Sequence, residues 1–205
     1  ESFENSIPTE WDTLGLDRAK NSLFNEGWVI DRDTTFTTMT GPSGAQDGSF
    51  YAYCDGSGPI GRGSEVVLTS PEIEIPSVRA PVLRFFLNMH GRSGEFKVNV
   101  VENGLTTTVL PAVNGDVPGG IHTIDEWEEI FVPLSDYIGS TVQIEFVATK
   151  PFDPNIGDVA IDNIIVCITA DPIPTLGQWS LIIMVLTFMV VGVIGLRSNS
   201  VSIAR

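Results

Sequence analysis

The chain has 205 residues and a formal net charge of -15, and 42% of its residues are apolar, so it is long enough for one sizeable domain and an appendage. Positions 1–171 hold nine basic residues against all 26 acidic ones, which leaves that region at -17. Such a charge repels nucleic acid and anionic lipid surfaces, and it excludes nucleic-acid binding as a function.

The first predicted element is a short helix over residues 17–24, capped by Asp17. From Trp28 to Ile168, apolar residues recur at every second position in short runs separated by Gly, Pro, Asn and Asp. This period predicts half-buried antiparallel strands, of which the clearest are residues 49–54, 65–69, 82–90, 95–102, 127–134, 141–149 and 158–168. Gly91 and Gly94 predict a hairpin turn within residues 88–94.

Residues 141–149 show the expected orientation of such a strand. Their apolar members, Val142, Ile144, Phe146 and Ala148, alternate with the polar Gln143 and Glu145, so one face is expected to be buried. Roughly ten short strands of this kind predict an all-β jelly roll, which is a two-sheet antiparallel β-sandwich. Trp28, in a Gly-Trp-Val-Ile segment, is expected to anchor its core.

The C-terminal part of the chain has a different composition. Residues 170–175 contain two prolines and predict a stiff linker after a sandwich domain over residues 1–169. Residues 176–196 hold no charged residue, and as one α-helix they extend about 31 Å, enough to cross a bilayer core or to pack in a bundle. Residues 176–205 are therefore predicted as a hydrophobic helix with a short tail.

Self-association is the expected use of this helix. Leu181, Met184, Phe188 and Val191 present large apolar side chains to the same helix in neighbouring copies. We expect a homo-oligomer or homopolymer with a sheltered helical bundle and the sandwich displayed outside, formed after a stage in the membrane. Plain membrane anchoring is the alternative.

A series of landmarks in the first 168 residues resembles the MAM domain family. In chain order they are Phe3-Glu4, Gly27-Trp28, Gly41-Pro42, residues 47–53, 68–71, 85–91 and 94–98, Trp127 and residues 160–164. The resemblance implies a jelly-roll β-sandwich of an extracellular adhesion or surface protein. It also implies that Glu4, Asp47 and Asp162 converge near the rim of the sandwich.

These three carboxylates form the best candidate metal site. Oxygen ligands suit Ca²⁺ or Na⁺ as a structural ion, and a buried carboxylate cluster requires a cation or protons. The alternative is that Asp162 and Asn163 only turn the last strand, while Glu4 and Asp47 are solvated.

The chain has two cysteines, Cys54 and Cys167. One disulfide between them and two buried free thiols are both open at this point. A disulfide requires the strand at residues 49–54 to lie beside or across from the terminal strand, with the two Cα atoms about 4.4 to 6.8 Å apart.

The segment Ile173-Pro174-Thr175-Leu176-Gly177-Gln178-Trp179, followed by an apolar run to Leu196 and by Arg197, resembles the IPTL-type C-terminal sorting signals of bacterial exported proteins. Exosortase-like membrane enzymes handle such signals. The resemblance therefore implies a Gram-negative-type bacterium and a cell-surface or extracellular destination. The chain starts at Glu1 without Met, and we expect the numbering to begin after a removed signal peptide.

No catalytic residue is predicted. His90 and His122 have no Ser or Cys in a nucleophile-elbow context. The acidic residues around Trp127, which are Asp125, Glu126, Glu128 and Glu129, are expected on a solvated strand end rather than as a glycosidase pair.

We therefore expect a non-enzymatic structural or adhesive surface protein, with an unidentified glycan or surface ligand. The alternative is a membrane-anchored carbohydrate-binding or adhesion module, in which Trp11, Trp28, Tyr51, Tyr53 and Trp127 would supply a sugar-stacking platform. Alternation argues instead that most of these aromatic residues are core. A hydrolase is the third reading, and it would need titratable groups in a cleft.

Overall fold

The computed structural model describes residues 3, 11–14, 27–35, 37, 39–56, 63–77, 80–115, 121–150 and 157–168. Glu4, the predicted helix at 17–24, the linker and the C-terminal helix with Leu181, Met184, Phe188 and Val191 lie outside these residues. The chain divides into two compact units, Glu1–Thr169 and Ala170–Arg205, and the described residues all belong to the first. Within them, no helix has the length and hydropathy of a membrane span.

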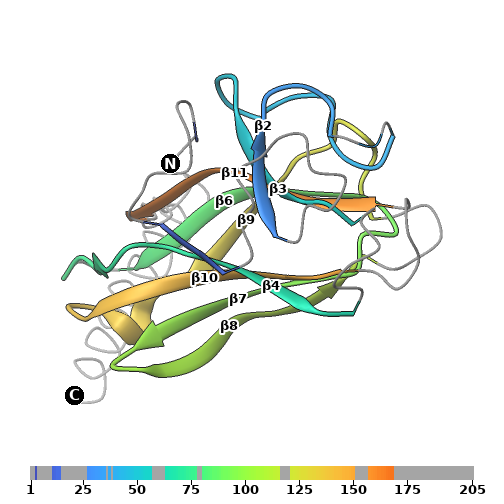
Figure 1. Ribbon diagram of the computed structural model, residues 1–205. Helices are drawn as coiled ribbons and strands as arrows, with labels where there is room; N and C mark the ends of the chain where they lie inside the picture. Colours follow the sequence, from blue (N-terminus) through green and yellow to red (C-terminus); the bar gives the residue numbers. More distant parts are fainter. Residues whose placement is uncertain are drawn as a thin grey trace, which may run out of the picture. The chain divides into compact units, whose positions relative to one another are not determined.

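Two antiparallel sheets face each other (Figure 1), which confirms the predicted all-β sandwich. Sheet A has the order β1-β4-β10-β7-β8, with β5 paired to β10, and sheet B has the order β2-β3-β11-β6-β9. The strands are β1 (Asp12–Leu14), β2 (Trp28–Asp31), β3 (Tyr51–Cys54), β4 (Glu65–Thr69), β5 (Ile73–Glu74), β6 (Pro81–Gly91), β7 (Glu95–Glu102), β8 (Leu105–Asn114), β9 (Glu128–Pro133), β10 (Thr141–Thr149) and β11 (Gly157–Ile168). A single 3-10 turn, Ser135–Tyr137, precedes β10 among the described residues.

The core lies between the sheets. On β10, Val142, Ile144, Phe146 and Ala148 are buried and the polar residues between them are half-buried, as the alternation predicts. Phe146 packs edge-on against Phe85 of sheet B, with ring centroids 5.3 Å apart. The aromatic contact therefore joins the two layers directly.

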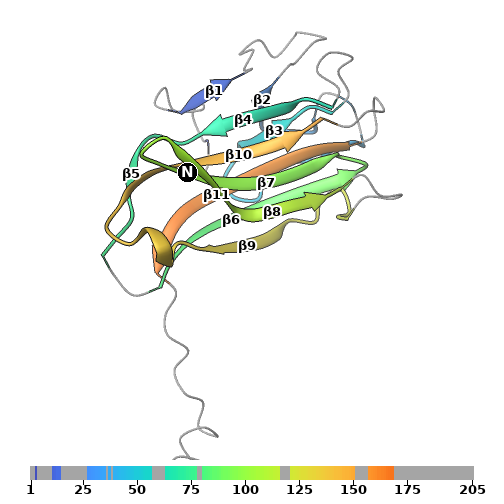
Figure 2. The same ribbon diagram turned by 90° about the horizontal axis from the view of Figure 1, so that it is seen from below.

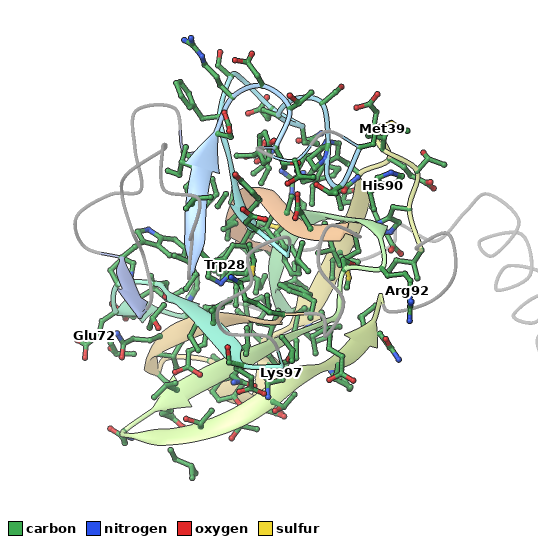
Figure 3. The ribbon with its side chains drawn as sticks, turned by 45° about the vertical axis from the view of Figure 1, so that its right-hand side comes forward. Trp28, Met39, Glu72, His90, Arg92 and Lys97 are labelled. Atoms are coloured by element: carbon green, nitrogen blue, oxygen red, sulfur yellow. The ribbon has the colours of Figure 1, made fainter. Side chains whose placement is uncertain are left out.

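Trp28 is the core anchor that the sequence predicts. Its side chain has no exposed surface and lies between the two layers in Figure 3. The indole Nε1 donates a hydrogen bond to the carbonyl of Val66 at 3.2 Å, which links β2 of sheet B to β4 of sheet A.

Two turns have the backbone conformation that their residues favour. Gly91 and Gly94 have φ angles of 71° and 80°, but the predicted hairpin is wrong: β6 belongs to sheet B and β7 to sheet A, so this turn carries the chain from one layer to the other. Asn103 and Gly104, with φ angles of 52° and 78°, form the two-residue turn between β7 and β8. Positive φ at both central positions is the signature of a type I′ turn, whose twist suits antiparallel strands.

The terminal strand β11 runs through the middle of sheet B, between β3 and β6 (Figure 2). Val159 and Ile161 point into the core, so Asp158 and Asp162 lie on the opposite, outer face of the strand. The pairing with β6 shifts between Asp162 and Ile165, where Asn163 has a φ of 50°. Asp162 therefore ends the regular part of the strand at a bulge.

Candidate functional site

The outer face of sheet B is covered by connections rather than by a third layer of strands. Tyr51, Tyr53 and Ala160 form a small buried cluster there, against which Val29, Ala45 and Trp127 pack. Ala45 belongs to the β2–β3 connection and Trp127 to the segment before β9. We call the described residues of 31–50, together with residues 121–127, the loop platform.

Asp158 fixes one part of the platform. The carboxyl is 1% exposed, and its Oδ2 accepts a hydrogen bond from Thr40 Oγ1 at 2.8 Å. Its Oδ1 accepts from the Gly56 amide at 2.8 Å, so the β2–β3 connection and the residues that follow β3 meet on one side chain. Burial raises the pKa of Asp158 to about 7, and the nearby Asp55 carboxylate adds to the rise.

Asp162 fixes a second part. Its Oδ2 accepts hydrogen bonds from the amides of Gln46 and Asp47 at 2.9 and 3.0 Å, and its Oδ1 accepts from the Asn163 amide at 2.7 Å. The side chain has no exposed surface. Burial raises the pKa of Asp162 to about 6, although these three amides act in the opposite direction, and the charge of Asp47 adds a smaller rise.

The predicted metal ligands are thus partly brought together. Asp162 lies next to Asp47, whereas Glu4 lies outside the described residues. No group of three His, Cys, Asp or Glu side chains in the described part of the chain is arranged to hold a metal ion. Asp162 is a buried oxygen donor whose charge lacks a cationic partner in its hydrogen-bond set, so its chemistry fits a hard cation such as Ca²⁺.

Asn88 and His122 fix the second connection to the end of β6. The buried Asn88 amide donates to the carbonyls of Thr123, Ile124 and Glu126 at 3.2, 3.2 and 2.9 Å. His122 Nδ1 accepts a hydrogen bond from the Met89 amide at 2.8 Å, which requires this nitrogen to be unprotonated. Its Nε2 then donates to Glu128 Oε2 at 3.1 Å, so both ring nitrogens have structural partners.

Both connections also contact each other. Asp125 Oδ1 accepts hydrogen bonds from the backbone amide and the hydroxyl of Ser43, and these bonds lower the pKa of Asp125. Trp127 packs edge-on against Tyr51, with ring centroids 5.9 Å apart. Met39 is 76% exposed, and Figure 3 shows it at the same end of the domain as His90. The platform is therefore one connected surface with an exposed apolar residue upon it.

The acidic residues around Trp127 have structural partners. Besides Asp125 and Glu128, Glu126 Oε2 accepts from the Thr123 amide at 3.0 Å and Glu129 pairs with Arg84 at 3.2 Å. Hydrogen-bonded and ion-paired carboxylates of this kind stabilise the chain locally.

The five aromatic candidates for a sugar platform belong to two clusters. Trp28 and Trp11 pack in the core between the sheets, and Tyr51, Tyr53 and Trp127 pack on the outer face of sheet B. Trp28, Tyr51 and Tyr53 are buried, as alternation predicts. Trp11 is half-buried on a different part of the domain, where it stacks on Phe146 with centroids 6.3 Å apart. These five residues therefore form no exposed planar row.

Cys54 and Cys167 are free thiols, so the disulfide alternative is wrong for this structure. The strand of Cys54 does lie beside β11, but Cys54 is opposite Val159, whereas Cys167 is opposite Val82. Eight residues of extended strand separate Val159 from Cys167, or roughly 26 Å, which no disulfide spans. Burial raises the pKa of the Cys54 thiol to about 12, so this thiol is unreactive.

A cavity of about 490 Å³ lies between the sheets, next to Trp11, Leu83, Phe146 and Ile164. Ser70 supplies a hydroxyl group to the cavity wall. Its Oγ donates a hydrogen bond to the Pro71 carbonyl and accepts one from the Ile144 amide, both at 2.8 Å. Glu74 is the charged group in its wall. The cavity therefore lacks the convergent polar groups that orient a polar substrate.

Known proteins resemble both the C-terminal segment and the sandwich of this chain. The IPTL-CTERM motif matches residues 171–198, the segment in which Ile173, Pro174, Thr175, Leu176 and Trp179 were singled out. No curated protein matches the chain in sequence.

Solved structures share the sandwich fold. The K1 cleaved adhesin domain of Lys-gingipain from Porphyromonas gingivalis W83 is 17% identical, with a TM-score of 0.55, and the match covers 83% of this chain and 97% of that domain. The carbohydrate-binding module TmCBM61, solved with β-1,4-galactotriose, is 15% identical, with a TM-score of 0.52, and the match covers 82% of this chain and 94% of the module. At these identities the likeness shows a common β-sandwich fold and leaves the MAM resemblance as an expectation.

Proposed function

We propose that this protein is an exported, non-enzymatic binding module of a Gram-negative-type bacterium, displayed at the cell surface, which contacts its ligand through the loop platform. The observation that carries the proposal is that three buried side chains, Asp158, Asp162 and Asn88, hold the platform on the sandwich, in addition to backbone hydrogen bonds. Connections fixed in this way on a rigid sandwich are the usual location of binding sites. The IPTL-CTERM match supports export and sorting.

A glycan is the ligand class that we favour. The fold is shared with a solved carbohydrate-binding module, and the exposed carboxylate of Asp33 on the platform can accept hydrogen bonds from sugar hydroxyls. Met39 adds an exposed apolar contact on the same platform.

Glycan-array binding by the purified full chain tests this proposal. We expect Met39→Glu to abolish binding, because it replaces an exposed apolar contact and leaves the buried anchors intact. Ile138→Glu is the matched control, since Ile138 is 45% exposed and lies outside the platform, and it should bind as the wild type does. Retained binding in the first variant, or equal loss in both, would place the ligand elsewhere.

We also propose a structural Ca²⁺ or Na⁺ bound by Asp47 and Asp162, with Glu4 as a third ligand. The burial of the amide-bonded Asp162 carboxyl supports the proposal, because an ionised carboxylate away from water requires a compensating positive charge. Chelation with EDTA at pH 8 should lower the Tm of the wild type, whereas Asp162→Asn should have the same Tm with and without EDTA. A wild-type Tm that EDTA leaves unchanged would contradict a Ca²⁺ site; the same comparison with and without NaCl tests Na⁺.

Self-assembly into a filament through the hydrophobic C-terminal helix completes the proposal. Its support is the charge-free run at residues 176–196, which as a helix would be apolar on every side. The double variant Met184→Asp with Phe188→Asp should then form no fibres in negative-stain micrographs while the sandwich stays folded. Fibres from this variant would leave membrane anchoring as the role of the helix.

A further inference from the structure

The edge of sheet A is formed by β8, a long strand without a charged residue. Leu105–Asn114 spans ten residues, and within the described part of the chain β7 is its strand partner. Figure 1 shows β8 as the outermost strand of its layer. Exposed edges of this length are normally blunted by charges, because unpaired amides and carbonyls otherwise pair with another chain.

The type I′ turn fixes which backbone groups face outward. Glu102 and Leu105 flank the two-residue turn as the first hydrogen-bonded pair, so Leu105 directs its amide and carbonyl toward β7. Alternate residues then point the other way. Thr106 and Thr108 therefore direct their backbone amides and carbonyls away from the sheet.

Pro111 limits the free edge at its other end. The β7 pairing becomes irregular beyond Thr108, and proline has no amide hydrogen to donate. The regular edge is thus Leu105–Val109, centred on Thr107. An antiparallel strand of the same sequence fits this segment when one Thr107 lies opposite the other.

From this register we infer that β8 is a contact surface for a second copy of the same chain, which joins the two A sheets edge to edge about a two-fold axis at Thr107. Thr106 of one copy exchanges both backbone hydrogen bonds with Thr108 of its partner, and the reverse pair does the same. Leu105, which is 71% exposed, lies opposite Val109 of the other copy.

The charge distribution favours this edge over other surfaces of the domain for contact between two copies. Residues 1–171 carry a net charge of -17, so most approaches of two copies bring like charges together, whereas residues 105–114 add no charge to the contact. The pair is weak, because five residues of strand bury far less than the roughly 1,200 Å² of stable interfaces. It becomes significant at the high local concentration of a protein held on a surface, which rests on the display proposed above.

Cysteine cross-linking of the full chain in mild detergent micelles tests the register without requiring display. With Cys167→Ser as background, Thr107→Cys should give a disulfide-linked dimer under mild oxidation, since Cα atoms in such non-hydrogen-bonded pairs are about 4.5 Å apart. Leu105→Cys is the control. Leu105 is exposed, as Thr107 is, but in this register the two substituted positions are roughly 13 Å apart, so Leu105→Cys should give little dimer.

A charge exchange on the same background completes the test. Thr106→Glu with Thr108→Glu places like charges opposite each other and should remove the Thr107→Cys cross-link. Thr106→Glu with Thr108→Lys places opposite charges across the contact and should restore it. No dimer from Thr107→Cys, or equal yields from Thr107→Cys and Leu105→Cys, would overturn the inference, whether or not the protein is displayed on cells.

Discussion

Two buried carboxylates on one face of β11 have related structural roles. Asp158 and Asp162 lie on either side of Ala160, and each accepts backbone amides from the β2–β3 region. Their environments differ in one respect. Asp158 also accepts a hydroxyl hydrogen bond and lies near Asp55, whereas Asp162 has only amide donors and lies near Asp47.

The raised pKa of Asp158 predicts a pH-dependent stability. The folded state keeps its proton up to about pH 7, whereas an unfolded aspartate loses it near 3.9, so this carboxyl makes unfolding easier as the pH rises from about 4 to about 7. Asp158→Asn stays neutral and can still accept from Gly56. In EDTA, we expect it to exceed the wild type at pH 8 by on the order of 2 kcal/mol in the free energy of unfolding.

Urea unfolding at pH 5, 6, 7 and 8 measures this difference. The stability of the wild type should converge on that of the variant at the acid end of the range. Equal slopes for the two proteins across the range would show that Asp158 is already ionised in the folded state.

At the scale of elements, the segment before β9 is held to β6 by two side chains and by a backbone hydrogen bond from the His122 amide to the Met89 carbonyl at 3.3 Å. Asn88 bonds three of its carbonyls, and His122 bonds the Met89 amide. Trp127, at the end of the segment, also packs against the buried Tyr51 cluster, so we expect the preceding residues to open before the sandwich unfolds as a whole.

Asn88→Ala should release this segment. The variant leaves three carbonyls of residues 123–126 without their donor, and we expect a loss of about 2 kcal/mol in stability. Hydrogen exchange at residues 121–127 should rise more than exchange in β10. Asn99→Ala is the matched control, because Asn99 donates to the Glu145 side chain and should leave residues 121–127 protected. Equal exchange in both variants would contradict the role of Asn88.

The alternation of apolar and polar residues correctly predicted the strands that have one buried face and one more exposed face. The ranges 65–69, 95–102 and 141–149 agree with β4, β7 and β10 residue for residue. The strand β8 was missed, because Thr106, Thr107 and Thr108 are all exposed and give no period of two. Edge strands bury little side-chain surface, so hydropathy carries little information about them.

The site was less predictable than the fold. The family resemblance pointed to Asp162. Asp158 and Asn88, in contrast, occupy outward positions of predicted strands, where a polar residue is expected to be exposed to solvent, although both are buried. Their burial depends on connections whose placement is set by contacts more than 30 residues away, such as Asn88 with Thr123. The alternation of apolar and polar residues along one strand cannot predict contacts between distant segments.

At the scale of the molecule, Trp28 connects the two sheets by a hydrogen bond as well as by packing. Trp28→Phe should lower the free energy of unfolding by about 1–3 kcal/mol, since it leaves the buried Val66 carbonyl without its donor and removes ring volume. Trp127→Phe, at a half-buried ring outside the main core, should lower it less. Guanidinium unfolding of both variants measures the difference, and equal losses would show that the link between the sheets adds nothing.

The position of β11 affects how the domain bears tension. Ile168 ends this central strand, which pairs with β6 over most of its length. When a C-terminal anchor holds the protein and a bound ligand pulls on the other end, the force runs along this strand. Its hydrogen bonds to both neighbours are then sheared together, whereas those of an edge strand would open one after another. If the protein is displayed and bound as proposed above, we expect the geometry of its last strand to make the domain resistant to unfolding by pulling.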